Sequence, residues 1–253
     1  MKTACALLGV CLLGAAKLSA VSDEVKLDRD WRALPLIKDG KVDPAWKQIG
    51  GGKFVVDEGT LRTAGDEAGM GMLLYAKEKF GNCGIRVVFR GQEAKSNSGV
   101  FVRIGDGVLK FADEKKIRGK QSVEQMKDAS EKALGAWYPV HHGFEVQISE
   151  AGDEYHRTGS VYSLSKAAPL PKLQPDGWRT MVITLKGNIV SVDVDGRHVS
   201  TFDSESKDLP KRKQWYEPMR EPKRPQAGYI GLQNHDPGDV VWFKEVSVRG
   251  LGE

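Results

Sequence analysis

The chain has 253 residues, of which 40% are hydrophobic and 28% are charged, a balance typical of a folded protein and not of a disordered one. This length accommodates one large β domain or at most two small domains. The formal net charge of +4 is too small to indicate a nucleic-acid-binding protein. No stretch after the N-terminal segment reaches the roughly 20 apolar residues that span a bilayer, so the sequence predicts no membrane span.

Residues 1–20 have the pattern of a secretory signal peptide. The positive Lys2 precedes an apolar stretch at 4–16, and residues 18–20 fit a cleavage site. We therefore expect an exported protein, periplasmic or extracellular, with a single mature domain at 21–253. A membrane anchor is the alternative, but the stretch is short for a span and no cysteine follows it, as a lipoprotein requires.

Cleavage of this segment changes the cysteine count and the charge. Only Cys83 remains, so no intrachain disulfide forms and stability must come from the core. We expect Cys83 to be a structural thiol. Loss of Lys2 and Lys17 lowers the formal charge from +4 to +2.

Runs of strand length recur from residue 52 to the end of the chain, with turn residues between them. The clearest pair flanks Gly187-Asn188, a two-residue turn that favours positive φ. The pattern predicts an all-β fold, a two-sheet sandwich or a barrel. The expected strands are 53–56, 60–63, 70–75, 84–90, 99–103, 144–148, 159–163, 180–186, 189–194, 197–202, 229–233 and 240–248.

Two segments break this pattern. An insertion at about 105–138 is highly charged, and its part at 122–134 has apolar residues near helical spacing. A second segment at about 204–225 is rich in proline and basic residues, so we expect a long solvated surface loop and not a central strand or a nucleic-acid patch. Loops of this length are usually functional or disordered.

Several strands alternate between an apolar face and an unusually polar face. Each polar face taken alone is typical of a solvated outer surface, but together these faces carry hydrogen-bonding groups and an aromatic ring and no lysine. Such a set suits a sugar, which offers hydroxyls and one apolar face. The polar-face residues are Phe101 and Arg103, Glu145 and Gln147, Ser160 and Tyr162, and Gln233 and His235.

The histidines add a candidate divalent metal site. His141 and His142 are adjacent, so at most one of them is expected to face a site, and His235 is followed by Asp236. Carboxylates and imidazoles can hold a divalent cation, but no compact ligand spacing is present, and the metal ligands stay unassigned. His156 and His198 are expected to be structural or exposed.

Four motifs and a closing strand, in order, resemble one known family. Residues 96–103 resemble an NSGxFxR motif, 144–148 an EVQI motif, 158–162 a TGxxY motif and 228–235 a GxIGLQxH motif, and 241–251 resemble the closing strand. The set is similar to the 3-keto-disaccharide hydrolase domain family, also called the 3-keto-glucoside 1,2-lyase/3-keto-2-hydroxy-glucal hydratase family. The resemblance covers about residues 27–251.

The resemblance implies a concanavalin A-like, two-sheet jelly roll with the site on its concave sheet. It also implies action on glycosides oxidised at C3, by β-elimination and hydration, which is net glycoside hydrolysis. The departures are Lys244, where the family often has arginine, and the long insertion beside the expected site.

Such chemistry needs a base of tuned pKa and a group that stabilises an enolate oxygen. Glu145 is the first choice as base, with His142 or His235 as competing choices. Arg103, or a metal, would stabilise the enolate. The expected substrate-binding residues are Asn97, Gln147, Tyr162, Gln233 and His235.

A carbohydrate-binding module without catalysis is the alternative, because fold does not decide function. Such a module needs aromatic platforms but no tuned base. Trp137, Tyr138, Trp215 and Tyr216 lie in the two long segments and could be platforms, or could equally anchor these segments in small local cores.

Overall fold

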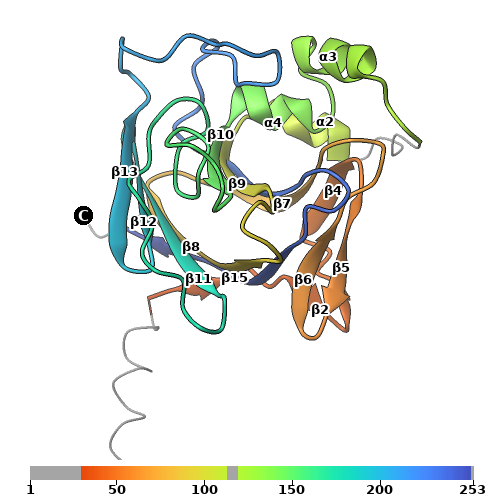
Figure 1. The fold of residues 1–253 in the computed structure, drawn as a ribbon, viewed down its shortest axis with the longest axis vertical. Coiled ribbons are helices and arrows are strands. Elements are labelled where there is room, and N and C mark those ends of the chain that lie inside the picture. Colours follow the sequence, from red (N-terminus) through yellow and green to blue (C-terminus); the bar gives the residue numbers. More distant parts are fainter. Residues whose placement is uncertain (1–29, 113–118, 252–253) are drawn as a thin grey trace, which may run out of the picture. The chain divides into compact units, whose positions relative to one another are not determined.

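Two antiparallel sheets form the framework of the fold (Figure 1). The computed structural model describes residues 30–112 and 119–251, and those from Arg32 onward belong to one compact unit. The larger sheet has eight strands in the order β13-β12-β11-β8-β15-β6-β5, with β1 paired to β15. The smaller sheet has five strands in the order β10-β9-β14-β7-β4, and β2 pairs with β3. The expectation of an all-β sandwich is confirmed.

The strands of the larger sheet are β1 (Arg32–Ala33), β5 (Lys53–Asp57), β6 (Thr60–Ala64), β8 (Cys83–Gly91), β11 (Arg179–Lys186), β12 (Ile189–Val194), β13 (Arg197–Asp203) and β15 (Val241–Gly250). The strands of the smaller sheet are β4 (Trp46–Gly50), β7 (Gly71–Phe80), β9 (Ser98–Ile104), β10 (Phe144–Ile148) and β14 (Gly228–Asn234). The separate hairpin consists of β2 (Ile37–Lys38) and β3 (Lys41–Val42).

The main core lies between the inner faces of the two sheets. On β11, Met181, Ile183 and Leu185 are fully buried, while the residues between them are partly exposed. Burial of one such side chain contributes about 1.5–3 kcal/mol. Cys83 is a buried free thiol in this core, as expected for a structural cysteine.

A second, smaller core covers part of the other face of the five-stranded sheet. It joins Phe101 and Ile104 of β9 to Phe111 of α2 (Leu109–Ala112) and Val140 of α4 (Trp137–His142). Helix α4 contacts β9 and β10, α2 contacts β4, and α3 (Val123–Glu131) contacts α4 (Figure 1). The helices therefore cover one part of this face and leave the rest available for a site.

The insertion is partly helical, as the sequence predicts for 122–134. It contains a short 3₁₀ turn at Asp106–Val108 and the helices α2, α3 and α4, and residues 113–118 lie outside the described part. A capping box, in which Ser122 and Gln125 bond each other's backbone, begins α3.

The strand expected at 159–163 does not form. Gly159 and Ser163 have φ of 87° and 57°, which bends the chain too sharply for a strand, and Val161 makes only isolated bridges to Val146 and Ser165. The Tyr162 amide still donates to the Glu145 carbonyl at 2.9 Å. This irregular segment therefore flanks β10 on its free edge.

The segment at 204–225 is a loop, as expected, and its arginines bind its own backbone. Arg212 donates to the carbonyl of Glu217 (3.0 Å), Arg220 to that of Pro210 (2.7 Å) and Arg224 to that of Met219 (2.6 Å). These basic side chains hold the loop in shape. Across the described residues, no helix combines the length and the apolar character that a membrane crossing requires.

The predicted signal peptide, residues 1–20, lies outside the described residues and stays a prediction, as do the predicted domain limits at 21 and 253.

Candidate functional site

A cavity of about 360 Å³ lies over the face of the five-stranded sheet that the helices leave free. Strands β10 and β14 and the segments that flank them provide its polar lining, while α3, α4 and the long loop provide most of its apolar lining. The lining residues are Met70, Asn97, Met126, Trp137, Val140, Glu145, Gln147, Tyr162, Trp215, Tyr216, Gln233, His235 and Asp236. Six of the eight residues that the sequence predicts for the site line this cavity: Asn97, Glu145, Gln147, Tyr162, Gln233 and His235.

Glu145 reaches the cavity because β10 alternates regularly. Val146 and Ile148 are buried in the main core, so Glu145 and Gln147 point to the opposite face. Gly99 of β9 leaves space for the carboxylate: a Cβ at this position would lie 2.5 Å from Oε1 of Glu145. The neighbouring strand is thus shaped to let this side chain lie across it.

The environment of Glu145 favours the protonated acid. The side chain is half-buried and densely surrounded by protein atoms, and this burial raises its pKa to about 8 against the opposing charge of His235 and a hydrogen bond from Gln233. A carboxyl group with a pKa near neutrality can both accept and return a proton at physiological pH.

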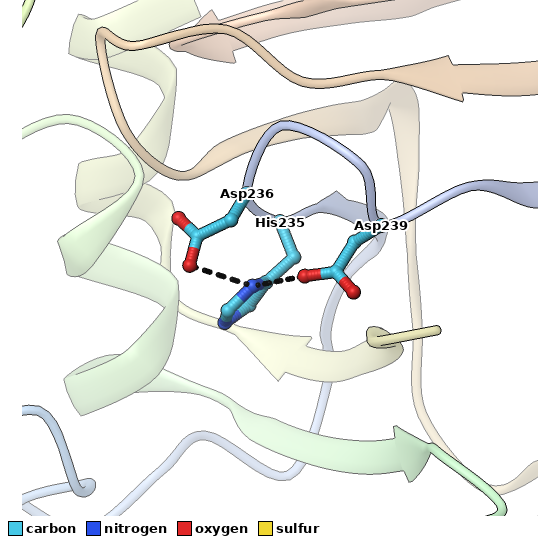
Figure 2. A group of neighbouring side chains, drawn as sticks. All are labelled: His235, Asp236 and Asp239. Atoms are coloured by element: carbon cyan, nitrogen blue, oxygen red, sulfur yellow. Dashed lines mark hydrogen bonds and ion pairs between the residues drawn. The ribbon is translucent and has the colours of Figure 1, made fainter. Parts of the chain in front are cut away.

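His235 follows β14 and is oriented by two aspartates (Figure 2). Its Nδ1 lies 2.9 Å from Oδ2 of Asp239 and 3.4 Å from Oδ2 of Asp236. The other ring nitrogen points away from both carboxylates (Figure 2). The Asp239 carboxylate is itself held by the backbone amide of Asn97, which donates to Oδ1 at 3.0 Å.

The carboxylates around His235 favour its charged form. Burial alone would lower its pKa, but the hydrogen bond with Asp239 and the charges of Asp236, Asp239 and Glu145 outweigh it, so the pKa is raised above its usual value. The pKa of Asp239 is lowered: its own burial opposes this, but the hydrogen bond and charge of His235 prevail. The result is an imidazole whose charged form is favoured, beside a carboxyl group whose pKa lies near neutrality.

Amide side chains complete the polar part of the cavity. Gln147 donates from Nε2 to Oδ1 of Asn97 at 3.2 Å. The buried Oε1 of Gln233 has no hydrogen-bond partner among the described residues. An acceptor of this kind in a cavity wall is available to a ligand hydroxyl.

Tyr162 adds a phenol to this polar set. Burial, and then the charge of Glu145, raise its pKa, so the phenol stays protonated and can donate. Its ring packs edge-on against His156, with ring centroids 5.0 Å apart.

The opposite side of the cavity is apolar and aromatic. Trp137 of α4 and Trp215 of the long loop pack with centroids 5.3 Å apart, and Tyr216 packs edge-on against Trp215 at 5.5 Å. Met126 of α3 and Met70 flank them. The two segments that break the strand pattern therefore meet over the site.

His141 is a structural link between these segments. The Met219 amide donates to Nδ1 (3.1 Å), so Nε2 carries the proton and donates to Oγ of Ser130 (3.0 Å). Ser130 in turn donates to the carbonyl of Trp215 at 3.0 Å. Burial, followed by the charges of nearby cations such as Arg212, lowers the pKa of His141 to about 4, so it is neutral.

The placement expected for Arg103 is wrong. Its φ of 53° and a β-bulge opposite β14 interrupt the alternation of β9, so that Ile104 and not Arg103 joins Phe101 in the smaller core. The guanidinium is buried and donates to the carbonyl of Gly187, at the turn between β11 and β12. Arg103 is absent from the cavity lining.

His142 also lies outside the lining. Its ring stacks on Tyr138 with centroids 4.2 Å apart. Burial, and then the charge of Arg224, lower its pKa. His156 and His198 have local partners, Asp153 and Asp193, as expected for structural or exposed histidines.

Sequence reasoning missed Asp239 and Gly99. The spacing of His235 and Asp239 around the turn Pro237-Gly238 is a signal that could have pointed to the first. No local signal points to Gly99, because the side chain that needs the space, Glu145, belongs to another strand.

His235, Asp236 and Asp239 also form a candidate metal group, with ligand atoms within 4.8 Å of one another. However, Nδ1 of His235 and both oxygens of Asp239 already take part in hydrogen bonds. A cation here would have to replace them, so the arrangement fits an oriented imidazole better than a metal centre.

The sequence profile of the 3-keto-alpha-glucoside-1,2-lyase-like domain matches residues 30–249. The chain belongs to this family. The resemblance read from the four motifs is therefore confirmed. No curated protein matches the chain.

Solved structures share the fold at low identity. A candidate glycosyl hydrolase from Parabacteroides distasonis is 18% identical, with 92% of this chain and 99% of that one covered and a TM-score of 0.58. A Bacillus subtilis protein of unknown function with a galectin-like fold is 15% identical (87% and 97% covered, TM-score 0.54). A carbohydrate-binding module of Bacillus subtilis is 9% identical (85% and 100% covered, TM-score 0.50). These likenesses confirm the jelly-roll fold.

Proposed function

We propose that this protein cleaves glycosides oxidised at C3, by β-elimination followed by hydration. Membership of the family supports a carbohydrate substrate of this kind. The observation that carries the proposal is Glu145, with a pKa of about 8, beside an imidazole that Asp239 orients and charges. A proton-transfer reaction at neutral pH needs such a pair.

The first step is removal of the proton at C2, which the C3 ketone acidifies. Ionised Glu145 takes this proton, and the electron pair moves to the C3 oxygen as an enolate. The enolate then re-forms the ketone and expels the C1 substituent, which leaves a C1–C2 double bond. The proton returns from Glu145 to the leaving oxygen, and water adds across the double bond to complete net hydrolysis.

His235 stabilises the enolate in this scheme. Its charged ring can donate from the nitrogen that faces away from Asp236 and Asp239, and a fixed cation next to a developing oxyanion lowers the barrier. It therefore takes the role that the sequence assigned to Arg103, which points elsewhere. Gln147, Gln233 and Tyr162 bind the sugar hydroxyls.

The lining does not fit a two-carboxylate glycosidase. Asp236 is the other carboxylate in the cavity lining, and it pairs with Nδ1 of His235 at 3.4 Å and not with Glu145. Retaining and inverting glycosidases need two carboxyl groups on either side of the scissile bond.

The test is turnover by purified residues 21–253. A 3-keto-glucoside with a chromogenic leaving group is compared with the unoxidised glucoside, with and without EDTA. We expect release from the keto compound alone and no loss with EDTA, because no step needs a metal. Loss with EDTA that added Mn²⁺ or Mg²⁺ restores would contradict the metal-free scheme.

A non-catalytic carbohydrate-binding module is the second candidate. The aromatic side of the cavity, with Trp137, Trp215 and Tyr216, favours it. Calorimetric binding of the glucoside without turnover of the keto compound would decide for the module.

We further propose that the protein is exported, on the signal-peptide pattern of residues 1–20. Mass spectrometry of the mature N-terminus after expression with residues 1–20 present tests this. A mature chain that keeps Met1 would contradict it.

A further inference from the structure

The cavity has two chemically different sides. The side formed by the sheet and its flanking segments carries the hydrogen-bonding groups Asn97, Glu145, Gln147, Gln233 and His235. The side formed by α3, α4 and the long loop is uncharged and carries Met126, Trp137, Val140, Trp215 and Tyr216, and Met70 extends it. A ligand whose hydroxyls bind the first side presents its remaining part to the second.

A second cavity of about 220 Å³ lies behind the apolar side. It shares Met70, Met126 and Trp137 with the first cavity. Glycine and alanine dominate the rest of its lining, which includes Gly51, Ala68, Gly69, Ala129, Gly135 and Ala136. Methionine is unbranched and adapts its shape readily, so movement of Met70 and Met126 would extend the site into this apolar space.

This arrangement discriminates between two kinds of leaving group. A second sugar ring has hydroxyls around its rim, and burial against Met70, Met126 and Val140 would leave many of them without partners. An unpaired buried hydroxyl is costly, and discrimination on this basis reaches several orders of magnitude. A flat apolar group has no such requirement and stacks on Trp137 and Trp215.

We infer that the apolar side is an aglycone subsite, and that the protein acts on 3-keto-glycosides of flat apolar alcohols or phenols in preference to 3-keto-disaccharides. The inference rests on the proposed elimination, because it concerns the C1 substituent that this reaction expels. The preferred substrate in this inference differs from the disaccharide that the family resemblance implies.

The experiment compares benzyl 3-keto-glucoside with a 3-keto-disaccharide that expels glucose, each as both anomers. Benzyl alcohol is a poorer leaving group than a sugar hydroxyl, so intrinsic reactivity favours the disaccharide. We expect kcat/KM to be at least tenfold higher for the benzyl compound nevertheless. A disaccharide cleaved as fast or faster would overturn the aglycone subsite and leave the elimination intact.

Two variants of α3 make the assignment specific. Met126→Gln places a polar amide in the apolar side, whereas Val123→Gln makes the same kind of change at a side chain that is 57% exposed and outside both cavities. We expect Met126→Gln to lower the ratio of benzyl to methyl 3-keto-glucoside turnover at least tenfold, and Val123→Gln to leave it unchanged. Equal ratios in both variants would contradict the inference.

A binding measurement keeps the subsite testable if neither keto compound turns over, an outcome that would reject the elimination itself. Titration calorimetry with unoxidised benzyl glucoside and methyl glucoside then reports on the apolar side alone. At least tenfold tighter binding of the benzyl compound, lost in Met126→Gln, supports the subsite. Equal affinities refute it.

Discussion

Gly99 of β9 lies directly beneath the carboxylate of Glu145, and a Cβ on Gly99 would approach Oε1 to 2.5 Å. The glycine thus sets the position of the proposed base, although Glu145 pairs across the strands with Phe101 and Gly99 pairs with Gln147. The missing side chain is a requirement of the site and not of the backbone, because Gly99 does not have a positive φ and pairs in register with β10.

Gly99→Ala should therefore displace Glu145 without unfolding the sheet. We expect kcat/KM for a 3-keto-glucoside to fall about 100-fold, because small misplacements of a catalytic group are costly. Gly81→Ala is the matched control, since a Cβ there meets its nearest atom at 3.7 Å. Circular dichroism and thermal unfolding check that both variants fold. Full activity of folded Gly99→Ala would show that Glu145 is not held by this contact.

Glu145→Gln should change stability in a pH-dependent way. The carboxyl has a pKa of about 8 in the folded protein against 4.5 as its ordinary value. The contribution of the protonated carboxyl to the free energy of unfolding is fully present below the ordinary pKa. It is lost as the pH rises from the ordinary pKa toward 8, because ionisation of this carboxyl in the site is unfavourable. The glutamine variant has no such group, so its stability relative to wild type should increase by up to about 4 kcal/mol between pH 4.5 and pH 9.

Denaturant unfolding of both proteins at the two pH values measures this difference. The comparison cancels the titration of all other groups that the substitution leaves unchanged. A constant difference between the proteins across this range would mean that the carboxyl ionises normally in the fold.

Asp239→Asn should weaken His235 as a cation. Without the carboxylate that raises the imidazole pKa, His235 loses its proton at lower pH, so the alkaline limb of the kcat/KM profile should move to lower pH. We expect kcat/KM at the optimum to fall about 10- to 100-fold, the usual effect of losing an orienting partner. Asp236→Asn should have a smaller effect, because its oxygen is 3.4 Å and not 2.9 Å from Nδ1. Identical profiles for Asp239→Asn and wild type would remove His235 from the mechanism.

Arg103→Met tests the corrected placement of Arg103. The guanidinium donates to the Gly187 carbonyl inside the fold, and Arg103 is not among the residues that line the cavity. We expect kcat/KM within about threefold of wild type, provided that thermal unfolding shows a folded variant. A folded variant with activity reduced 100-fold would restore Arg103 to the site.

The sequence predicted the sheets well because most strands alternate without interruption. Glu145 and Gln147 could be assigned to one face, since β10 is regular and its other side chains are buried. Arg103 was assigned to the wrong face because a bulge and a positive φ reverse the alternation, and neither is visible in the strand pattern. Tyr162 reaches the site although its expected strand is absent, because its amide still pairs with β10.

Other parts of the site depend on contacts between distant segments. Trp137 and Trp215 come together because Ser130 and His141 join the insertion to the long loop. No local pattern specifies such a link. The sequence therefore indicated that these aromatic residues could be platforms or anchors. In the structure they line the cavity and pack the two segments against each other, and the platform role stays a prediction.

In the proposed mechanism, Glu145 removes the C2 proton of a 3-keto-glycoside. The most direct measurement follows exchange of the C2 hydrogen with solvent D₂O and release of the aglycone, for wild type and Glu145→Gln in parallel. We predict that wild type gives aglycone release from the keto compound alone, with solvent deuterium at C2 of the product sugar, and that both signals fall at least 1000-fold in folded Glu145→Gln. Release from the unoxidised glycoside, or unchanged turnover in Glu145→Gln, would contradict the account.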